Sequence, residues 1–235
     1  MSNFLDHSLF IFDWDGTLST STLLVRLSRL FNTRYNVSGH EQPLHRRAVP
    51  MPDYRRMEAG LERKNIFYAR LYDFYSGFSI PRLRNGSMDA LLQLSRRGKR
   101  IAVFSDSEEY RLLHEAKVLG VIGKVDMVLS AKSIGYYKPR PEGLMLLMEK
   151  YKSDPGESIY VGDMASDVLT ARLAGMHSCG IAGGLERYDI LQRAKPDYLF
   201  KDMQDLAAYL KERVQARRSP KTNKPVPHFA RQSTH

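Results

Sequence analysis

The stretch Leu9-Phe10-Ile11-Phe12-Asp13-Trp14-Asp15-Gly16-Thr17 decides the fold of this chain. Its first four residues, Leu9–Phe12, are all apolar, which is typical of a strand buried on both faces in a parallel sheet. Two carboxylates, Asp13 and Asp15, follow directly, and Gly16 permits a tight turn beside them. Because open parallel sheets bind ligands beyond the carboxyl ends of their strands, the stretch predicts a site at this strand end.

Outward from this stretch, strand and helix patterns alternate along the chain. Further apolar runs predict strands at 101–104, 125–129, 158–161, 179–182 and 198–200. Amphipathic segments between them predict helices at 87–97, 106–120, 141–151, 167–174 and 203–213, with Ser87 as the N-cap of the first. This alternation predicts an α/β fold, a doubly wound parallel sheet covered by helices on both faces.

The alternation is interrupted between residues 20 and 86, where two helical patterns are separated by a proline-containing loop. We expect residues 1–19 and 87–213 to form the α/β core, and 20–86 to form a small helical cap inserted after the first strand. Residues 214–235 are basic and poor in apolar residues, so they predict a disordered tail.

The net charge of +10 is unevenly distributed over the 235 residues. Residues 20–86 contain twelve Lys/Arg and five Asp/Glu, whereas the core is mildly acidic. The basic cap is either an ordinary solvated surface or a means of attracting an anionic substrate to an acidic core. Candidate residues for that attraction are Arg26, Arg46, Arg47, Arg55, Arg56 and Arg63.

The single cysteine, Cys179, excludes an internal disulfide and suits a reducing compartment. The N-terminus lacks the pattern of a signal peptide, and no run approaches the roughly 20 apolar residues that a membrane-spanning helix needs. We therefore expect a cytoplasmic protein with no membrane partner.

Four motifs occur in a definite order, each after a predicted strand or the loop that follows it. Asp13–Thr17 follows the first strand, Ser105 ends the second, Lys138–Glu142 lies in a later loop, and Gly162–Asp167 follows another strand. This series resembles the haloacid dehalogenase (HAD)-like hydrolase superfamily, over about residues 8–200. The segment from Asp167 to Gly175, together with a helical insert after the first motif, resembles its phosphoglycolate-phosphatase-like branch.

The resemblance implies a Rossmann-like core and a phosphatase that hydrolyses the phosphate monoester of a small metabolite. Asp13 would be the nucleophile and would form an aspartyl-phosphate that water later cleaves. Asp15 would protonate the leaving group and then deprotonate the water. Ser105 would donate a hydrogen bond to a phosphate oxygen, and Lys138 would neutralise charge on Asp13 and the phosphate.

The resemblance also implies Mg²⁺ as the cofactor. Its expected ligands are the carboxylates of Asp13 and Asp163 and the main-chain carbonyl of Asp15, which are the hard oxygen donors that Mg²⁺ prefers. Around these ligands, Thr17 is expected to hydrogen-bond within the loop. Asp167 is expected to orient metal-bound water or Lys138.

Two residues depart from the common family pattern without touching these roles. Trp14 lies where smaller apolar residues are common. Asp106 follows Ser105 where many members have asparagine, and it either weakens anion binding near the site or caps the next helix.

The sequence leaves several alternatives open. The same core supports phosphomutases, and it supports phosphonatases when a cap lysine forms a Schiff base, for which Lys64 is the only candidate in 20–86. A nucleic-acid-associated protein, or a phosphatase of polynucleotide ends, would use the basic cap and tail. The partner expected first is a small anionic phosphorylated substrate. Its identity, and the oligomeric state, cannot be read from the sequence.

Overall fold

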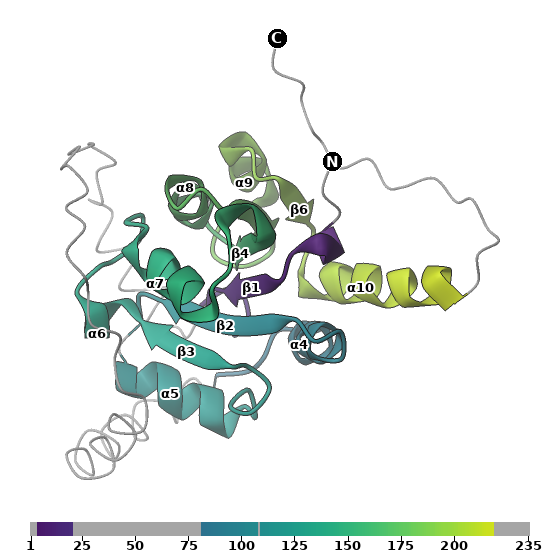
Figure 1. The fold of residues 1–235 in the computed structure, drawn as a ribbon, viewed down its shortest axis with the longest axis horizontal. Coiled ribbons are helices and arrows are strands. Elements are labelled where there is room, and N and C mark those ends of the chain that lie inside the picture. Colours follow the sequence, from purple (N-terminus) through teal and green to yellow (C-terminus); the bar gives the residue numbers. More distant parts are fainter. Residues whose placement is uncertain (1–3, 21–80, 108, 219–235) are drawn as a thin grey trace.

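The computed structural model describes residues 4–20, 81–107 and 109–218 (Figure 1). In these ranges six parallel strands form one sheet in the order β3-β2-β1-β4-β5-β6. The strands are β1 (Leu9–Phe12), β2 (Arg100–Ser105), β3 (Met127–Ser130), β4 (Ser158–Gly162), β5 (His177–Ile181) and β6 (Tyr198–Phe200). The predicted parallel α/β core is confirmed. The predicted helical cap, with Lys64 and the basic candidates, lies almost entirely outside the described residues and stays a prediction.

Helices cover both faces of the sheet (Figure 1). One side carries α4 (Ser87–Ser95), α5 (Glu109–Val118) and α10 (Met203–Arg218), and the other carries α7 (Glu142–Tyr151), α8 (Ala165–Leu173) and α9 (Tyr188–Ala194). Three short helical turns complete the described chain: η1 (Phe4–Asp6), α6 (Ala131–Ile134) and η2 (Pro155–Glu157). None of the helices in the described ranges is long and apolar enough to cross a membrane.

The central strand β1 is buried on both faces. Phe10 and Phe12 belong to the core that includes residues of α4, α5 and α10, whereas Leu9 and Ile11 belong to the core that includes residues of α7 and α8. Full burial of such a side chain stabilises the fold by about 1.5–3 kcal/mol. This two-sided burial explains why the strand sequence is continuously apolar rather than alternating, and it fixes the strand end where Asp13 begins.

Two expectations about helix ends are corrected. Ser87 is not the N-cap of α4, because Gly86 holds that position at a φ of 88° and the Ser87 hydroxyl donates to the Leu18 carbonyl at 2.9 Å. A Cβ on Gly86 would overlap the backbone of α10 at Met203 and Gln204, so the close approach of these helices requires glycine. The last helix, α10, continues to Arg218 rather than ending at residue 213, and residues 219–235 lie outside the described chain.

Candidate active site

The loop after β1 places Asp13 and Asp15 at the carboxyl edge of the sheet. The backbone N–H of Asp13 donates to the Val161 carbonyl of β4 at 2.8 Å, which extends the strand pairing by one residue. The chain then turns sharply: the N–H of Ser19 donates to the Trp14 carbonyl at 2.9 Å, and the N–H of Gly16 donates to the Ser19 carbonyl at 2.9 Å. Gly16 adopts a φ of 89°, a conformation that residues with a Cβ rarely take.

Lys138 connects two of the predicted carboxylates. Its Nζ donates to Asp13 Oδ1 at 2.8 Å and to Asp167 Oδ1 at 2.7 Å, and all three side chains are at most 4% exposed. The other oxygen of Asp167, Oδ2, accepts from the backbone N–H of Met164 at 2.9 Å, at the start of α8. Asp167 therefore contacts Lys138 directly, while the orienting role that the resemblance implied for it stays a prediction.

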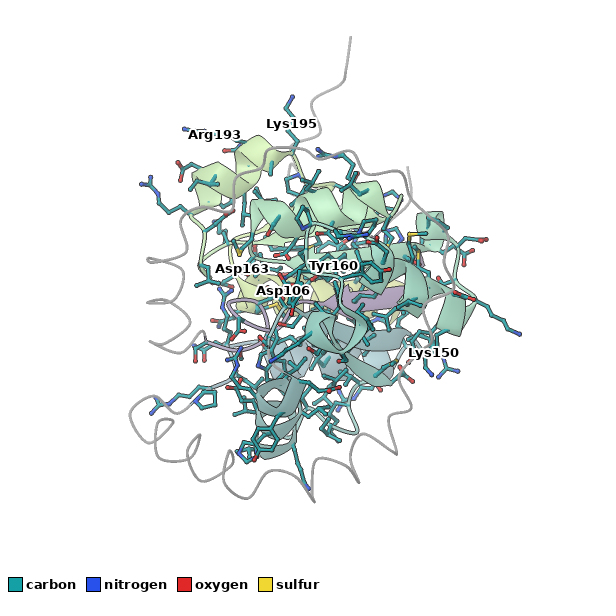
Figure 2. All side chains as sticks on the ribbon, turned by 90° about the vertical axis from the view of Figure 1, so that its left-hand side faces the viewer. Asp106, Lys150, Tyr160, Asp163, Arg193 and Lys195 are labelled. Carbon is teal, nitrogen blue, oxygen red and sulfur yellow. The ribbon has the colours of Figure 1, made fainter. Side chains whose placement is uncertain are left out.

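Asp163 approaches the same group from the end of β4. The Thr17 hydroxyl lies 3.5 Å from Asp13 Oδ2 and 3.3 Å from Asp163 Oδ1, and can donate to one of them at a time. Asp163 Oδ2 accepts from the backbone N–H of Leu185. In Figure 2 the labelled Asp163 lies in the central part of the molecule with Asp106 and Tyr160, whereas Lys150, Arg193 and Lys195 lie at its periphery.

The acidic side chains form a group that can hold a metal ion. One carboxylate oxygen from each of Asp13, Asp163 and Asp167 lies within 4.8 Å of the others, and all three residues are buried. Buried carboxylates this close repel one another unless cations neutralise them. Because the donors are all hard oxygens, the group suits Mg²⁺ or Ca²⁺ better than a softer metal.

The pKa shifts of Asp13 and Lys138 also favour a bound cation in this group. Burial raises the pKa of Asp13 well above its usual value; the Lys138 ammonium opposes this, while Asp167 and Asp163 raise the pKa further. Burial alone would lower the pKa of Lys138, but Asp13 and Asp167 outweigh it and hold that pKa well above its usual value. A cation bound beside these three carboxylates would oppose the rise in the pKa of Asp13 and favour its ionised form.

The second motif lies beside Asp13 on the neighbouring strand. Ser105 ends β2, which pairs with β1; its hydroxyl donates to Ser107 Oγ at 3.0 Å and accepts from the Ser107 N–H at 3.2 Å. Asp106 Oδ1 accepts from the backbone N–H of Lys138 at 3.0 Å. The carboxylate at position 106 therefore helps to hold the loop that carries the lysine, a contact that the sequence did not indicate.

Arg111, Ser107 and Glu115 are residues of the site that the sequence reasoning missed. Arg111 donates to both carboxylate oxygens of Asp15, and Ser107 Oγ also donates to Asp15 Oδ2. Glu115 accepts from Arg111 at 3.2 Å and from Trp14 Nε1 at 2.7 Å. The four-residue spacing of Arg111 and Glu115 predicts a helical ion pair, but not its contact with the first motif.

Arg84 is a further missed residue, in the segment directly before α4. Its guanidinium donates to the Gly16 carbonyl and, at 2.8 Å, to the Ala182 carbonyl. Burial lowers the pKa of Arg84, and the nearby Asp163 opposes that effect. Arg84 therefore fixes the turn of the first motif against the loop that follows β5.

Comparisons with known proteins agree with this geometry. A family model described as haloacid dehalogenase-like hydrolase matches residues 7–175. Pyrophosphatase PpaX from Bacillus pumilus is 26% identical over 202 residues, covering 84% of this chain and 94% of that protein. A protein named "Probable phosphatase IndB" from Dickeya dadantii is 29% identical over 210 residues, covering 81% and 88% of the two chains.

Among solved structures, one described as a predicted phosphoglycolate phosphatase from Haemophilus somnus superposes with a TM-score of 0.62. It is 21% identical and covers 88% of this chain and 99% of its own, a likeness that shows the shared fold. The resemblance noted in the sequence is thus confirmed by a model that spans the four motifs up to Gly175 and by relatives of similar length. The chain belongs to the haloacid dehalogenase-like hydrolase family, and the prediction that it is an enzyme of that family is confirmed.

Proposed function

We propose that this enzyme is a Mg²⁺-dependent phosphatase that hydrolyses the phosphate monoester of a small anionic metabolite through an aspartyl-phosphate on Asp13. The observation that carries the proposal is the contact between the buried Asp13 carboxylate and Lys138 Nζ at 2.8 Å, beside Asp163. A nucleophilic carboxylate can approach an anionic phosphate only where positive charge offsets the repulsion. Lys138 supplies one such charge.

In the first half-reaction, a carboxylate oxygen of Asp13 forms a bond to phosphorus as the bond to the ester oxygen breaks. The leaving alkoxide takes a proton from Asp15, and the phosphoryl group stays on Asp13. In the second half-reaction, Asp15 removes a proton from water, which attacks phosphorus and releases inorganic phosphate. Asp13 is then regenerated. Ser105, at the end of the adjacent strand, is proposed to donate to a phosphate oxygen.

The metal would be held by Asp13, Asp163 and the main-chain carbonyl of Asp15. When bound, Mg²⁺ would neutralise phosphate charge and keep Asp13 ionised. Thr17, which lies within 3.5 Å of both Asp13 and Asp163, would fix their separation. Asp167 would act on Lys138 rather than on the metal, since its two oxygens accept from Lys138 and Met164.

The substrate is proposed to be small because the relatives are named as phosphatases or pyrophosphatases of similar length. Phosphoglycolate, a phosphate monoester, is therefore the first compound to assay, and inorganic pyrophosphate, a phosphoanhydride, is assayed beside it. A cytoplasmic location is proposed because the single cysteine, Cys179, cannot form an internal disulfide, which suits a reducing compartment.

The test is phosphate release from p-nitrophenyl phosphate, pyrophosphate and a panel of metabolites by the purified chain with and without Mg²⁺. We expect Asp13→Asn to lose at least about 10³-fold in kcat, because a neutral amide cannot form the acyl phosphate. Asp154→Asn, an exposed aspartate before β4, is the matched control. Hydroxylamine added during turnover should convert the acyl phosphate into a hydroxamate on Asp13, detectable by peptide mass spectrometry. Unchanged turnover by Asp13→Asn would refute the proposal.

A further inference from the structure

The carboxylate of Asp15 is held on both oxygens by donors from the start of α5 and the turn before it. Arg111 Nη1 donates to Oδ1 at 3.0 Å and Nη2 donates to Oδ2, while Ser107 Oγ also donates to Oδ2. The side chains of Arg111 and Asp15 are only 13% and 7% exposed. A two-pronged contact between a guanidinium and a carboxylate fixes the plane of the carboxylate as well as its position.

Arg111 is itself held in place by Glu115. Glu115, one helical turn further along α5, accepts from Arg111 Nη1 at 3.2 Å and from the indole Nε1 of Trp14 at 2.7 Å. Glu115 is 1% exposed and Trp14 is fully buried. A buried carboxylate is stable only with such donors around it, so these contacts fix one another. The chain of contacts begins at Trp14 and ends at Asp15, the next residue of the same loop.

This arrangement restrains a freedom that matters for proton transfer. An aspartate can rotate its carboxylate about the terminal torsion at little cost, and a displacement of about 1 Å in a reacting group can cost about 10²-fold in rate. We propose that Arg111 is a positioning residue that fixes the Asp15 carboxylate for proton transfer to the leaving oxygen, with Glu115 and Trp14 fixing Arg111. The inference rests on the proposed phosphatase function, in which Asp15 supplies that proton.

The alternative interpretation of the same contacts is that Arg111 holds Asp15 in a position from which it cannot reach the substrate; this is called storage below. The two readings predict opposite effects of removing the guanidinium. Storage predicts faster turnover in an Arg111 variant, whereas positioning predicts slower turnover that is confined to substrates whose leaving group needs a proton. Arg111 is itself held by a second buried carboxylate, that of Glu115. A guanidinium held in this way favours a fixed position for Asp15 over one from which Asp15 must be released.

The experiment compares two phosphate esters with the full chain and Mg²⁺. The nitrophenolate of p-nitrophenyl phosphate leaves without a proton, whereas the alkoxide of glycerol 1-phosphate needs one. We expect Arg111→Gln to lower kcat about 10²-fold for glycerol 1-phosphate but less than about tenfold for p-nitrophenyl phosphate, as Asp15→Asn should. Arg111→Lys should retain more activity than Arg111→Gln. Equal losses on both esters, or a gain on either, would overturn the positioning role.

Two controls separate this effect from misfolding. Arg111→Gln leaves Glu115 as a buried carboxylate short of a partner, so the double variant Arg111→Gln with Glu115→Gln is measured too, and the thermal midpoint of each protein is recorded. Arg100→Gln breaks a single-contact arginine–aspartate ion pair with Asp126 near the surface, and should leave both activities unchanged.

A readout independent of turnover uses Trp14, the only tryptophan of the chain. Its single indole N–H resonance should shift in Glu115→Gln and Arg111→Gln, and should stay in place in Arg100→Gln. The shift caused by Asp15→Asn should shrink in the Arg111→Gln background, because Arg111 transmits it. Additive shifts would overturn the inference. If the wild-type chain turns over neither ester while Asp13→Asn is equally inactive, the proposed function fails, and this resonance still decides whether Arg111 fixes Asp15.

Discussion

Lys138 Nζ lies 2.8 Å from Asp13 Oδ1, and both side chains are almost completely buried. A buried ammonium is tolerated only among acceptors, and Asp167 provides a second one at 2.7 Å. The pair on which the proposed nucleophilic role of Asp13 rests is therefore also part of what holds β1, α8 and the lysine loop together. Activity and stability should respond jointly when it is broken.

Replacing Lys138 by methionine should lower both the activity and the stability of the protein. We expect kcat/KM for phosphate release to fall about 10²–10³-fold, because the proposed reaction loses the positive charge that would offset the charge of the phosphate. The free energy of unfolding should fall by about 3–5 kcal/mol, because buried carboxylates lose their partner. Steady-state kinetics and urea denaturation measure the two effects.

Lys150→Met is the matched control, because Lys150 is an exposed lysine of α7 that lies at the periphery in Figure 2. It should behave like the wild-type chain in both measurements. A Lys138→Met protein that is inactive but fully stable would contradict the joint role of the pair, since the structure places Lys138 between two buried carboxylates.

If the proposed Mg²⁺ site is correct, adding Mg²⁺ should stabilise the protein and removing it should destabilise the protein. At a Mg²⁺ concentration of 100 times its Kd, binding to the folded state alone contributes about 2.7 kcal/mol. For a chain of this size that corresponds to a rise of roughly 5–10 °C in the thermal midpoint. Differential scanning fluorimetry with a Mg²⁺ series, and with EDTA, measures the change. The rise should disappear in Asp163→Asn and persist in Asp154→Asn; an equal rise in both variants would show that the ion binds elsewhere.

Gly16→Ala should damage the metal site in particular. At its φ of 89° any side chain is strained, and a Cβ there would overlap Asp163 Oδ2. Gly98 is the control, since it also has a positive φ, of 66°, but a Cβ on it meets nothing within 4 Å. Both substitutions should cost about 1–2 kcal/mol of stability through backbone strain. Only Gly16→Ala should also shift the Mg²⁺ midpoint upward and reduce turnover, and equal behaviour of the two variants would contradict this.

The sequence carried enough information for the sheet because its strands are continuous apolar runs. Leu9–Phe12 and Tyr198–Phe200 have the bounds that the pattern predicts. The sequence was less informative for α9, because Leu191 is the one buried residue of this helix and no apolar stripe marks it. The extension of α10 to Arg218 follows from residues with high helix propensity rather than from an apolar face. The hydrophobic pattern therefore does not predict the last residues of this helix.

The same distinction holds for the candidate site. Asp13, Asp163 and Lys138 are recognisable because each follows a strand or precedes a helix in a fixed order, and the topology brings strand ends together. Arg111 is different, because its contact with Asp15 depends on how α5 lies against the loop after β1. No spacing in the sequence encodes that tertiary placement, and only the structure reveals the residue.

His7 precedes β1 and lies at the opposite edge of the sheet from the site. His7 is 1% exposed, its ring lies 4.6 Å from that of His177, and its Nε2 lies 3.5 Å from the Tyr198 hydroxyl. Burial, followed by the nearby His177, lowers the pKa of His7 from 6.5 to about 4, against smaller opposing effects of Gly156 and Asp6. The folded protein therefore binds the proton less tightly than the unfolded chain does.

This difference in proton affinity sets how the stability depends on pH. Above a pH of about 6.5 both states are neutral at His7, and its contribution is complete; as the pH falls from 6.5 to about 4, the unfolded chain gains a proton first and stability is lost, by at most about 3 kcal/mol. His7→Gln, which keeps a polar group but cannot titrate, should flatten the fall in urea midpoint over this range. Parallel pH curves for wild type and His7→Gln would show that His7 is not buried in its neutral form.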